Sequence, residues 1–327
     1  MVPPLIALEE HFFSTGVLNS LNDKYAEQFK YVHGLRDKLA DLEEIRLNEM
    51  DKGKISMQVI SHACVPGAPT SEECRDGNNQ LAEACKKHPD RFAGFAVLPM
   101  ADPEESAREL ERCVKEHSFV GALIDNHVNG KYYDGAEYDC VWHKAQQLDV
   151  PIYLHPVWPS ENMQMQYTGN FSDGASRSLG ASGWGWHTDC GLHVLRLHAS
   201  GLFDKFPQLK IIIGHMGEML PFQLQRVCNL STRWGDLKRD LKQVWKENIW
   251  ITTSGVWSLD PLRCILHNTP IDHILFSVDY PFEKNENGLK WMQELEESGL
   301  VTKEQLEMIA HKNSEKLLRV KAPYVLS

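Results

Sequence analysis

Four side chains of the types that bind metal ions lie far apart in the sequence, yet each follows a short run of apolar residues. They are Glu9, His11, His155 and Asp279. A set of carboxylates and imidazoles suits Zn, Mn, Mg or Fe and leaves coordination positions for solvent or substrate. The chemistry that this set indicates is that of a Lewis acid acting on a small substrate.

Two of the four residues, Glu9 and His11, are two positions apart in the motif LEEHF. Successive side chains of a β-strand point to opposite faces, so Glu9 and His11 are expected on one face and Glu10 on the other. His215 follows another apolar run, in GHMGE. It is either a fifth ligand or an acid/base beside the metal, oriented by Glu218, and we expect the second role.

These residues need a scaffold that brings the ends of separate strands together. Apolar, β-rich runs predict eight strands, over residues 4–8, 57–61, 92–98, 119–124, 150–154, 209–213, 249–253 and 273–278. Amphipathic stretches predict helices over residues 41–52, 72–87, 103–116, 139–148, 193–203, 220–227, 260–267 and 302–320. Such an alternation closes most simply into an α/β fold of the TIM type, a (β/α)8 barrel with its site at the C-terminal ends of the strands.

Length and composition agree with one barrel domain over residues 1–327. The chain is 42% hydrophobic and 24% charged, which excludes disordered and collagen-like proteins. A formal net charge of -11 argues against nucleic acid and membrane surfaces as partners. The eight cysteines are scattered singly and no apolar run could span a bilayer, so we expect reduced thiols and a cytoplasmic protein.

A doubly wound open sheet is the alternative fold. It is disfavoured because the first strand is not followed by a G-x-G-x-x-G turn. The sequence also has no phosphate-binding loop, so no organic cofactor is expected. Two long insertions, at residues 13–40 and 158–187, interrupt the barrel pattern and are expected to form lids or pocket walls.

The ordered motifs LEEHF, DVPIYLHP, FPQLKIIIGHMGE and ILFSVDYPFE resemble those of amidohydrolase-related decarboxylases of the 2-amino-3-carboxymuconate semialdehyde decarboxylase type. Among these, the chain is most similar to ortho-hydroxybenzoate decarboxylases such as γ-resorcylate and 2,3-dihydroxybenzoate decarboxylase. The resemblance extends from about residue 5 to residue 282. It implies an amidohydrolase-like barrel with one divalent metal ion (Zn, Mn or Mg) held by Glu9, His11, His155 and Asp279.

The resemblance also implies an activity. This is metal-dependent, nonoxidative decarboxylation of an ortho-hydroxybenzoic acid to the phenol and CO2, reversible as a carboxylation. The substrate would be 2,3-dihydroxybenzoate, 2,6-dihydroxybenzoate, salicylate or a methylated relative. Asp279 would donate the proton to the ring, with His215 and Glu218 in the acid–base network. Partners would be the aromatic acid, CO2 or bicarbonate, and further copies of the chain in a homodimer or homotetramer.

Other residues at strand ends or in the second insertion are expected to contact the substrate. They are Phe282, Asn126, Trp186, His187 and Ser254. Phe282 is close enough in sequence to Asp279 to contact an aromatic ring, and Asn126 is placed to bond a second ring hydroxyl.

Two other functions use the same residues. A metal-dependent hydrolase of a lactone or amide would share the barrel and its ligands. Hydrolytic relatives usually have histidine where Glu9 stands, and binuclear ones have a lysine where this chain has Asp125, Asn126 and His127, so both features count against it. A noncatalytic barrel would be expected to have lost at least one ligand.

Overall fold

The computed structural model describes residues 2–20, 25, 29–30, 32–64 and 67–323. Its eight strands are parallel, and each pairs with the next one in the sequence. They are β1 (Leu5–Phe12), β2 (Ile55–His62), β3 (Phe92–Ala96), β4 (Gly121–Asp125), β5 (Ile152–His155), β6 (Ile211–Ile213), β7 (Ile249–Thr252) and β8 (Ile274–Leu275). A bridge between Leu8 and Ser277 joins β1 to the end of β8. The predicted (β/α)8 barrel and its strands are therefore confirmed.

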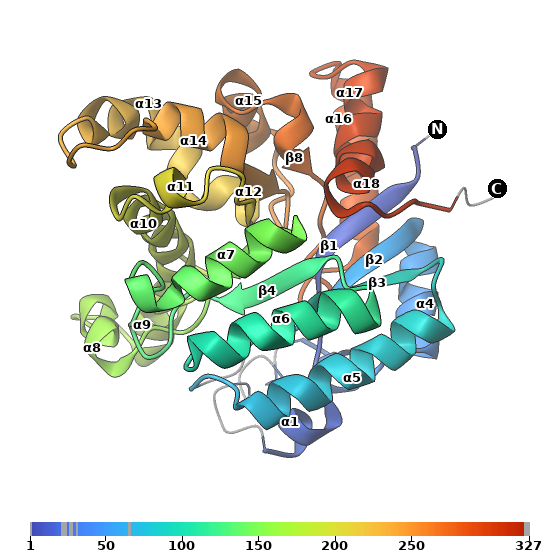
Figure 1. Ribbon diagram of the computed structural model, residues 1–327. Coiled ribbons are helices and arrows are strands. Elements are labelled where there is room, and N and C mark those ends of the chain that lie inside the picture. Colours follow the sequence, from blue (N-terminus) through green and yellow to red (C-terminus); the bar gives the residue numbers. More distant parts are fainter. Residues whose placement is uncertain (1, 21–24, 26–28, 31, 65–66, 324–327) are drawn as a thin grey trace.

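Helices surround the strands, and β1 and α18, the first and last labelled elements of the described chain, lie on the same side of the molecule (Figure 1). The helices on the first half of the barrel are α4 (Glu44–Lys52), α5 (Ser71–Lys87), α6 (Pro103–His117) and α7 (Asp139–Leu148). Those on the second half are α10 (Gly185–Ala199), α11 (Leu202–Lys205), α13 (Leu220–Ser231), α14 (Leu241–Asn248), α15 (Leu259–Asn268), α16 (Asn285–Ser298), α17 (Lys303–Glu307) and α18 (Asn313–Leu318).

The helix predictions differ from the structure at several places around the barrel. Helix α10 begins well before the expected residue 193, and a π-helical turn at Met308–Lys312 interrupts the expected terminal helix. Helices α14 and α16 were not predicted. The first turn of α16, Asn-Glu-Asn-Gly, contains residues of low helix propensity. Gly288 is needed there because a Cβ would lie 2.8 Å from the ring of Phe276.

Alternation along the strands separates the barrel interior from the layer under the helices. The inner cluster contains Ile6, Leu8, Met57, Val59, Phe95, Leu123, Tyr153, Ile212 and Leu275. Their strand neighbours, such as Leu5, Ile60 and Leu154, pack outward in a separate cluster. His155 follows Tyr153 by two residues and therefore points into the barrel at its C-terminal end.

The two insertions meet at that end of the barrel. The first contains α1 (Thr15–Ser20) and α3 (Leu35–Ala40), and part of it lies outside the described residues. The second contains α8 (Glu161–Gln164), a 3-10 turn (Met165–Tyr167) and α9 (Asp173–Gly180). The ring of Trp158 in the second insertion lies 4.9 Å from that of Tyr25 in the first, and 5.4 Å from that of Trp186 in its own insertion.

Two further observations concern the sequence expectations. All eight cysteines are free thiols. Within the described part of the chain, none of the helices combines the length and the apolar character that crossing a membrane requires.

Candidate active site

Glu9 lies at a β-bulge in the first strand. Between Ala7 and Glu10, β1 contains one residue more than the opposite stretch of β2, and Glu9 has a φ of 63°. Since Ile6 and Leu8 point inward, strict alternation would send Glu10 inward and Glu9 and His11 outward. The bulge shifts this alternation by one residue, so Glu9 and His11 both reach the mouth of the barrel.

Four potential ligands from three strand ends face one another there. Oε1 of Glu9 lies 3.4 Å from Nε2 of His155, and Nε2 of His11 lies 3.3 Å from Oδ1 of Asp279. Glu9 Oε1, His11 Nε2 and Asp279 Oδ1 are buried and lack a hydrogen-bond partner. Buried polar atoms without partners are rare in native proteins. Their convergence fits a bound cation that would contact them all.

Hydrogen bonds hold Glu9 and His11 through the side-chain atoms that do not face the other ligands. The hydroxyls of Tyr153 and Ser254 both donate to Oε2 of Glu9. Tyr153 also contacts Thr252 at 2.8 Å, and the Ser61 hydroxyl lies 3.2 Å from Nδ1 of His11. These contacts orient Glu9 and His11 so that Oε1 and Nε2 face the centre of the site.

Burial dominates the protonation of the cluster. It raises the pKa of Glu9 and that of Asp279 to about 7 each. It lowers the pKa of His11 to about 3 and also lowers that of His155. Both imidazoles are therefore neutral, which is the form that binds metals, and ionisation of the two carboxylates would be favoured by a compensating positive charge.

A second polar cluster adjoins the first. His215–Glu218 forms a tight turn, labelled α12, at the end of β6, and Met216 and Gly217 have left-handed backbone angles there. Nδ1 of His215 and Nδ1 of His187 lie 2.8 Å from the two different oxygens of Glu218. His187 also contacts the carbonyl of Ser182 through Nε2, at 3.0 Å. One buried carboxylate thus holds two imidazoles.

The charges of this second cluster reinforce one another. Burial alone would lower the pKa of His215, but the carboxylates of Glu218, Glu9 and Asp279 outweigh it and raise the pKa to about 10. Burial alone would raise the pKa of Glu218, but His215 and His187 lower it to about 2. In the metal-free protein His215 is therefore a cation at neutral pH, beside an ionised Glu218.

Residues 48–320 match the Amidohydrolase family, which is well over half of the chain. The chain belongs to this family. Over 325 residues it is 58% identical to decarboxylase orsB of Emericella nidulans, with 98% of each chain covered. Two crystal structures extend the comparison with other amidohydrolases.

One is 2,6-dihydroxybenzoate decarboxylase complexed with 2,6-dihydroxybenzoate, which is 33% identical. The match covers 97% of this chain and 100% of that one, with a TM-score of 0.85. The other is dihydroxybenzoic acid decarboxylase from Polaromonas sp. with bound manganese and the inhibitor 2-nitroresorcinol. It is 36% identical, with 97% of each chain covered and a TM-score of 0.85. The predicted resemblance to amidohydrolase-related decarboxylases of aromatic acids is confirmed.

Of the five expected substrate contacts of this amidohydrolase, Phe282 and His187 contact residues of the two polar clusters, and Trp186 packs within the second insertion. The ring of Phe282 lies 5.7 Å from that of His11. His187 contacts Glu218, and Trp186 packs on Trp158 with its indole nitrogen buried and unpartnered.

The other two expected contacts have protein partners in the structure, and their contact with a substrate stays a prediction. Ser254 is fully buried and donates to Glu9, so its hydroxyl orients a proposed ligand. Asn126 is also fully buried. Its amide nitrogen donates to Asp189 at 2.7 Å, and its oxygen accepts from His193 at 2.9 Å. Both amide atoms therefore have protein partners, and the side chain fastens β4 to α10.

Sequence reasoning missed Tyr153, Ser61 and Thr252, which support Glu9 and His11. The signal for Tyr153 was available, because it lies two residues before His155 on the same strand and so shares its face. Ser61 and Thr252 are small polar residues at strand ends, and only the barrel register assigns them to their partners.

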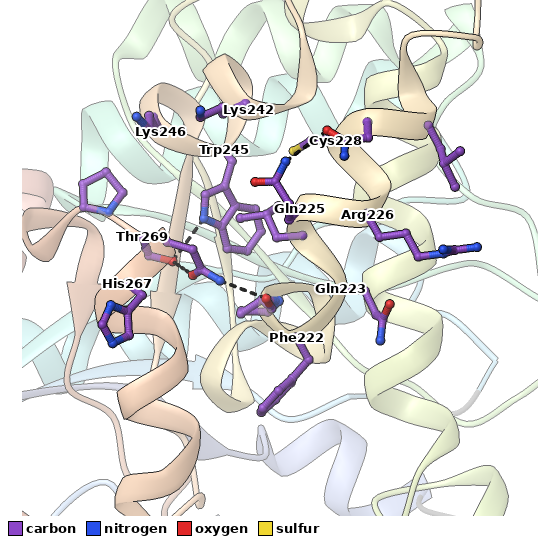
Figure 2. Close-up of a pocket in the computed structure, with 16 residues that line it drawn as sticks. Phe222, Gln223, Gln225, Arg226, Cys228, Lys242, Trp245, Lys246, His267 and Thr269 are labelled. Carbon is purple, nitrogen blue, oxygen red and sulfur yellow. Dashed lines mark hydrogen bonds between the residues drawn. The ribbon is translucent and has the colours of Figure 1, made fainter.

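A cavity of about 1000 Å³ lies outside the barrel, between α13, α14 and α15 (Figure 2). Its walls include Phe222, Arg226 and His267, and Trp245 donates across it to Thr269 at 3.1 Å. None of the residues expected in the active site lines this cavity. It is therefore separate from the metal-type cluster.

Proposed function

We infer that this protein is a metal-dependent, nonoxidative decarboxylase of an ortho-hydroxybenzoic acid. The observation that carries this inference is the set of unpartnered ligand atoms of Glu9, His11 and Asp279 beside the His215–Glu218 pair. The relatives named as decarboxylases support it, since they match nearly the whole chain.

The proposed metal ligands are Glu9, His11, His155 and Asp279. Manganese is the ion in the relative from Polaromonas, and we propose Mn²⁺ here, with Zn²⁺ and Mg²⁺ as alternatives. When bound, the cation would act as a Lewis acid that stabilises negative charge on the carboxylate and on an ortho oxygen of the substrate, which is why an ortho hydroxyl is expected there. No organic cofactor is required, because the ring itself accepts the electron pair.

Asp279 is the proposed proton donor. An aryl carbanion is not stabilised, so the ring carbon must gain a proton before or while CO2 leaves. Burial raises the pKa of Asp279, and the negative charge of a bound aromatic acid would raise it further, so Asp279 would carry that proton in the substrate complex. A C–H bond forms at the carbon that bears the carboxyl group. The C–C bond then breaks, its electron pair restores the aromatic ring, and CO2 departs.

His215 is proposed to return the proton to Asp279. Its Nε2 lies 4.0 Å from Oδ2 of Asp279, and Glu218 holds the opposite side of its ring. Glu218 also shares its charge with His187, which stabilises both imidazoles in place. Run in reverse, the same groups would accept the ring proton during carboxylation of the phenol.

A substrate panel tests the proposal. Metal content and CO2 release would be measured on the same Mn²⁺-loaded sample with 2,6-dihydroxybenzoate, 2,3-dihydroxybenzoate, salicylate and orsellinate. 4-Hydroxybenzoate is the control that lacks the ortho hydroxyl. Turnover restricted to ortho-hydroxy acids is the expected result, with 2,6-dihydroxybenzoate the first candidate. Metal-replete protein that decarboxylates none of them would redirect the assignment to hydrolysis of a lactone or amide.

We also propose a homodimer or homotetramer. Leu192 on α10 and Phe222 on α13 are 47% and 50% exposed, which is unusual for large apolar side chains unless another surface covers them. Light scattering coupled to size-exclusion chromatography would measure the mass, and a monomer at micromolar concentration would contradict this proposal.

A further inference from the structure

Glu10 lies between two proposed ligands in the sequence but points away from them, and it is fully buried. Its Oε1 accepts the backbone N–H of Val278 at 3.0 Å, and its Oε2 accepts that of Tyr280 at 3.1 Å. These two amides belong to the residues on either side of Asp279. The carboxyl group of Glu10 on β1 therefore accepts hydrogen bonds from the residues immediately before and after Asp279, the proposed fourth ligand.

The bulge at Glu9 explains why a side chain, and not the backbone of β1, accepts these two hydrogen bonds. The main chains pair on both sides of it, from Leu8 N to Phe276 O at 3.4 Å and from His11 N to Tyr280 O at 2.6 Å. In a regular parallel sheet, backbone N–H groups of the residues that continue β8 would donate to carbonyl oxygens of β1. Here two of them donate to the carboxylate of Glu10 instead.

Asp279 needs such support. Its φ of 75° lies in the left-handed region, which is unfavourable for a residue with a side chain. Hydrogen bonds at the preceding and the following peptide restrain this conformation. They thereby fix the direction in which the carboxylate of Asp279 leaves the backbone.

A buried cation completes the arrangement. Gln58 donates to Glu10 at 3.3 Å and accepts from Nη1 of Arg46 at 3.0 Å. Arg46 is fully buried, donates to the carbonyl of His11, and lies 4.9 Å from the ring centre of Tyr280. Arg46 thus places a cation one hydrogen-bonded residue away from Glu10, and it contacts His11 and Tyr280, one on each of the two segments that Glu10 connects.

We propose that Glu10, linked through Gln58 to Arg46, is a positioning clamp that sets Asp279 at the correct distance from Glu9 and His11. Glu10 touches neither substrate nor metal; it acts through the backbone on either side of a ligand. This inference rests on the proposed metal site and deepens it.

The experiment measures Mn²⁺ binding to chelator-treated protein by calorimetry, together with the electron paramagnetic resonance spectrum of the bound ion. In Glu10→Gln, an amide NH2 must face one of the two backbone N–H groups, so one hydrogen bond is lost. We expect Mn²⁺ to bind about 10-fold or more weakly, as for other residues that orient metal ligands, and with a broadened spectrum. Glu10→Asp keeps the carboxyl group but is too short to reach both amides, so we expect a loss there too.

Glu109→Gln is the matched control. Glu109 is a carboxylate on α6 with 2% exposure that accepts from Asn78 at 2.8 Å and pairs with Arg112. Its loss is expected to lower the unfolding temperature and leave Mn²⁺ affinity unchanged. A general effect of neutralising a buried carboxylate would instead weaken binding in both variants, and that result would overturn the clamp.

The remaining outcomes are also decisive. Folded Glu10→Gln with native affinity and spectrum would overturn the clamp while leaving the proposed function intact. Failure of the native protein to bind Mn²⁺, Zn²⁺ or Mg²⁺ would overturn the metal site and the clamp together. If Glu10→Gln does not fold, Gln58→Leu separates Glu10 from Arg46. We expect about threefold weaker binding in that variant, and native affinity there would overturn the proposal.

Discussion

Nε2 of His215 lies 4.0 Å from Oδ2 of Asp279, although the two residues follow different strands, β6 and β8. The separation is too long for a direct hydrogen bond but short enough for one to form after a small movement of either side chain. Because Glu218 holds the other ring nitrogen at 2.8 Å, His215 has one free N–H to offer, and it points toward Asp279. This arrangement underlies the first prediction.

Replacing His215 with Asn should separate proton transfer from metal binding. We expect kcat to fall by about 100-fold or more, the usual contribution of a general acid or base. Mn²⁺ content should stay at the native level, because His215 contacts the proposed ligands only through Asp279. Metal analysis and steady-state kinetics on one preparation check this prediction. A variant purified without metal would show that His215 is itself a ligand.

The substitution Asp279→Asn should affect both properties. The amide keeps the shape of the side chain, so the barrel should fold, but it cannot deliver a carboxyl proton and is a weaker ligand. We expect no measurable turnover and about 10-fold or more weaker Mn²⁺ binding. Near-normal turnover would remove Asp279 from the mechanism.

Tyr153→Phe tests the support of Glu9. The change removes one of the two hydroxyls that donate to Oε2 of Glu9, and we expect about 10-fold weaker Mn²⁺ binding. Tyr280→Phe is the control, since the hydroxyl of Tyr280 is buried without a hydrogen-bond partner. Calorimetric titration of both variants should show a loss only in the first. Equal affinities would mean that Ser254 alone orients Glu9.

The sequence was sufficient to predict the barrel and the grouping of the metal-type residues. The apolar runs mark all eight strands, and the barrel rule then assigns Glu9, His155 and Asp279 to one rim. It was not sufficient for the local backbone. A β-bulge adds one residue to a strand, and the sequence LEEHF gives no sign of the left-handed angle at Glu9 that turns His11 inward.

Side-chain partners were harder to predict than positions. Ser254 and Asn126 lie at strand ends, as the sequence indicates, but their hydrogen-bonding atoms are engaged by residues remote in sequence: Ser254 by Glu9 and Asn126 by Asp189. His187 was expected from the sequence to contact the substrate, but its bond to Glu218 was not foreseen. Such pairings depend on the strand register and on the path of α10, which no single motif encodes.

Metal binding should depend on pH with a definite sign. In the metal-free protein, burial raises the pKa of Glu9 from 4.5 to about 7 and that of Asp279 from 3.8 to about 7. At pH values between the ordinary pKa of each group and its raised pKa, the folded state binds more protons than the unfolded state. The contribution of both groups to the free energy of unfolding therefore falls as pH rises through this range. A cation requires both carboxylates ionised, so it must displace these protons below about pH 7.

We therefore expect Mn²⁺ affinity to rise between about pH 6 and pH 7.5 and then to level off. Calorimetry in buffers of different ionisation enthalpy should detect proton release at about pH 6 and little at about pH 8. His11 does not contribute, because its pKa is lowered to about 3 and it is neutral throughout this range. Asp279→Asn removes one of the two groups and should reduce the protons released. Binding that is independent of pH and releases no protons would show that both carboxylates are ionised before the metal arrives.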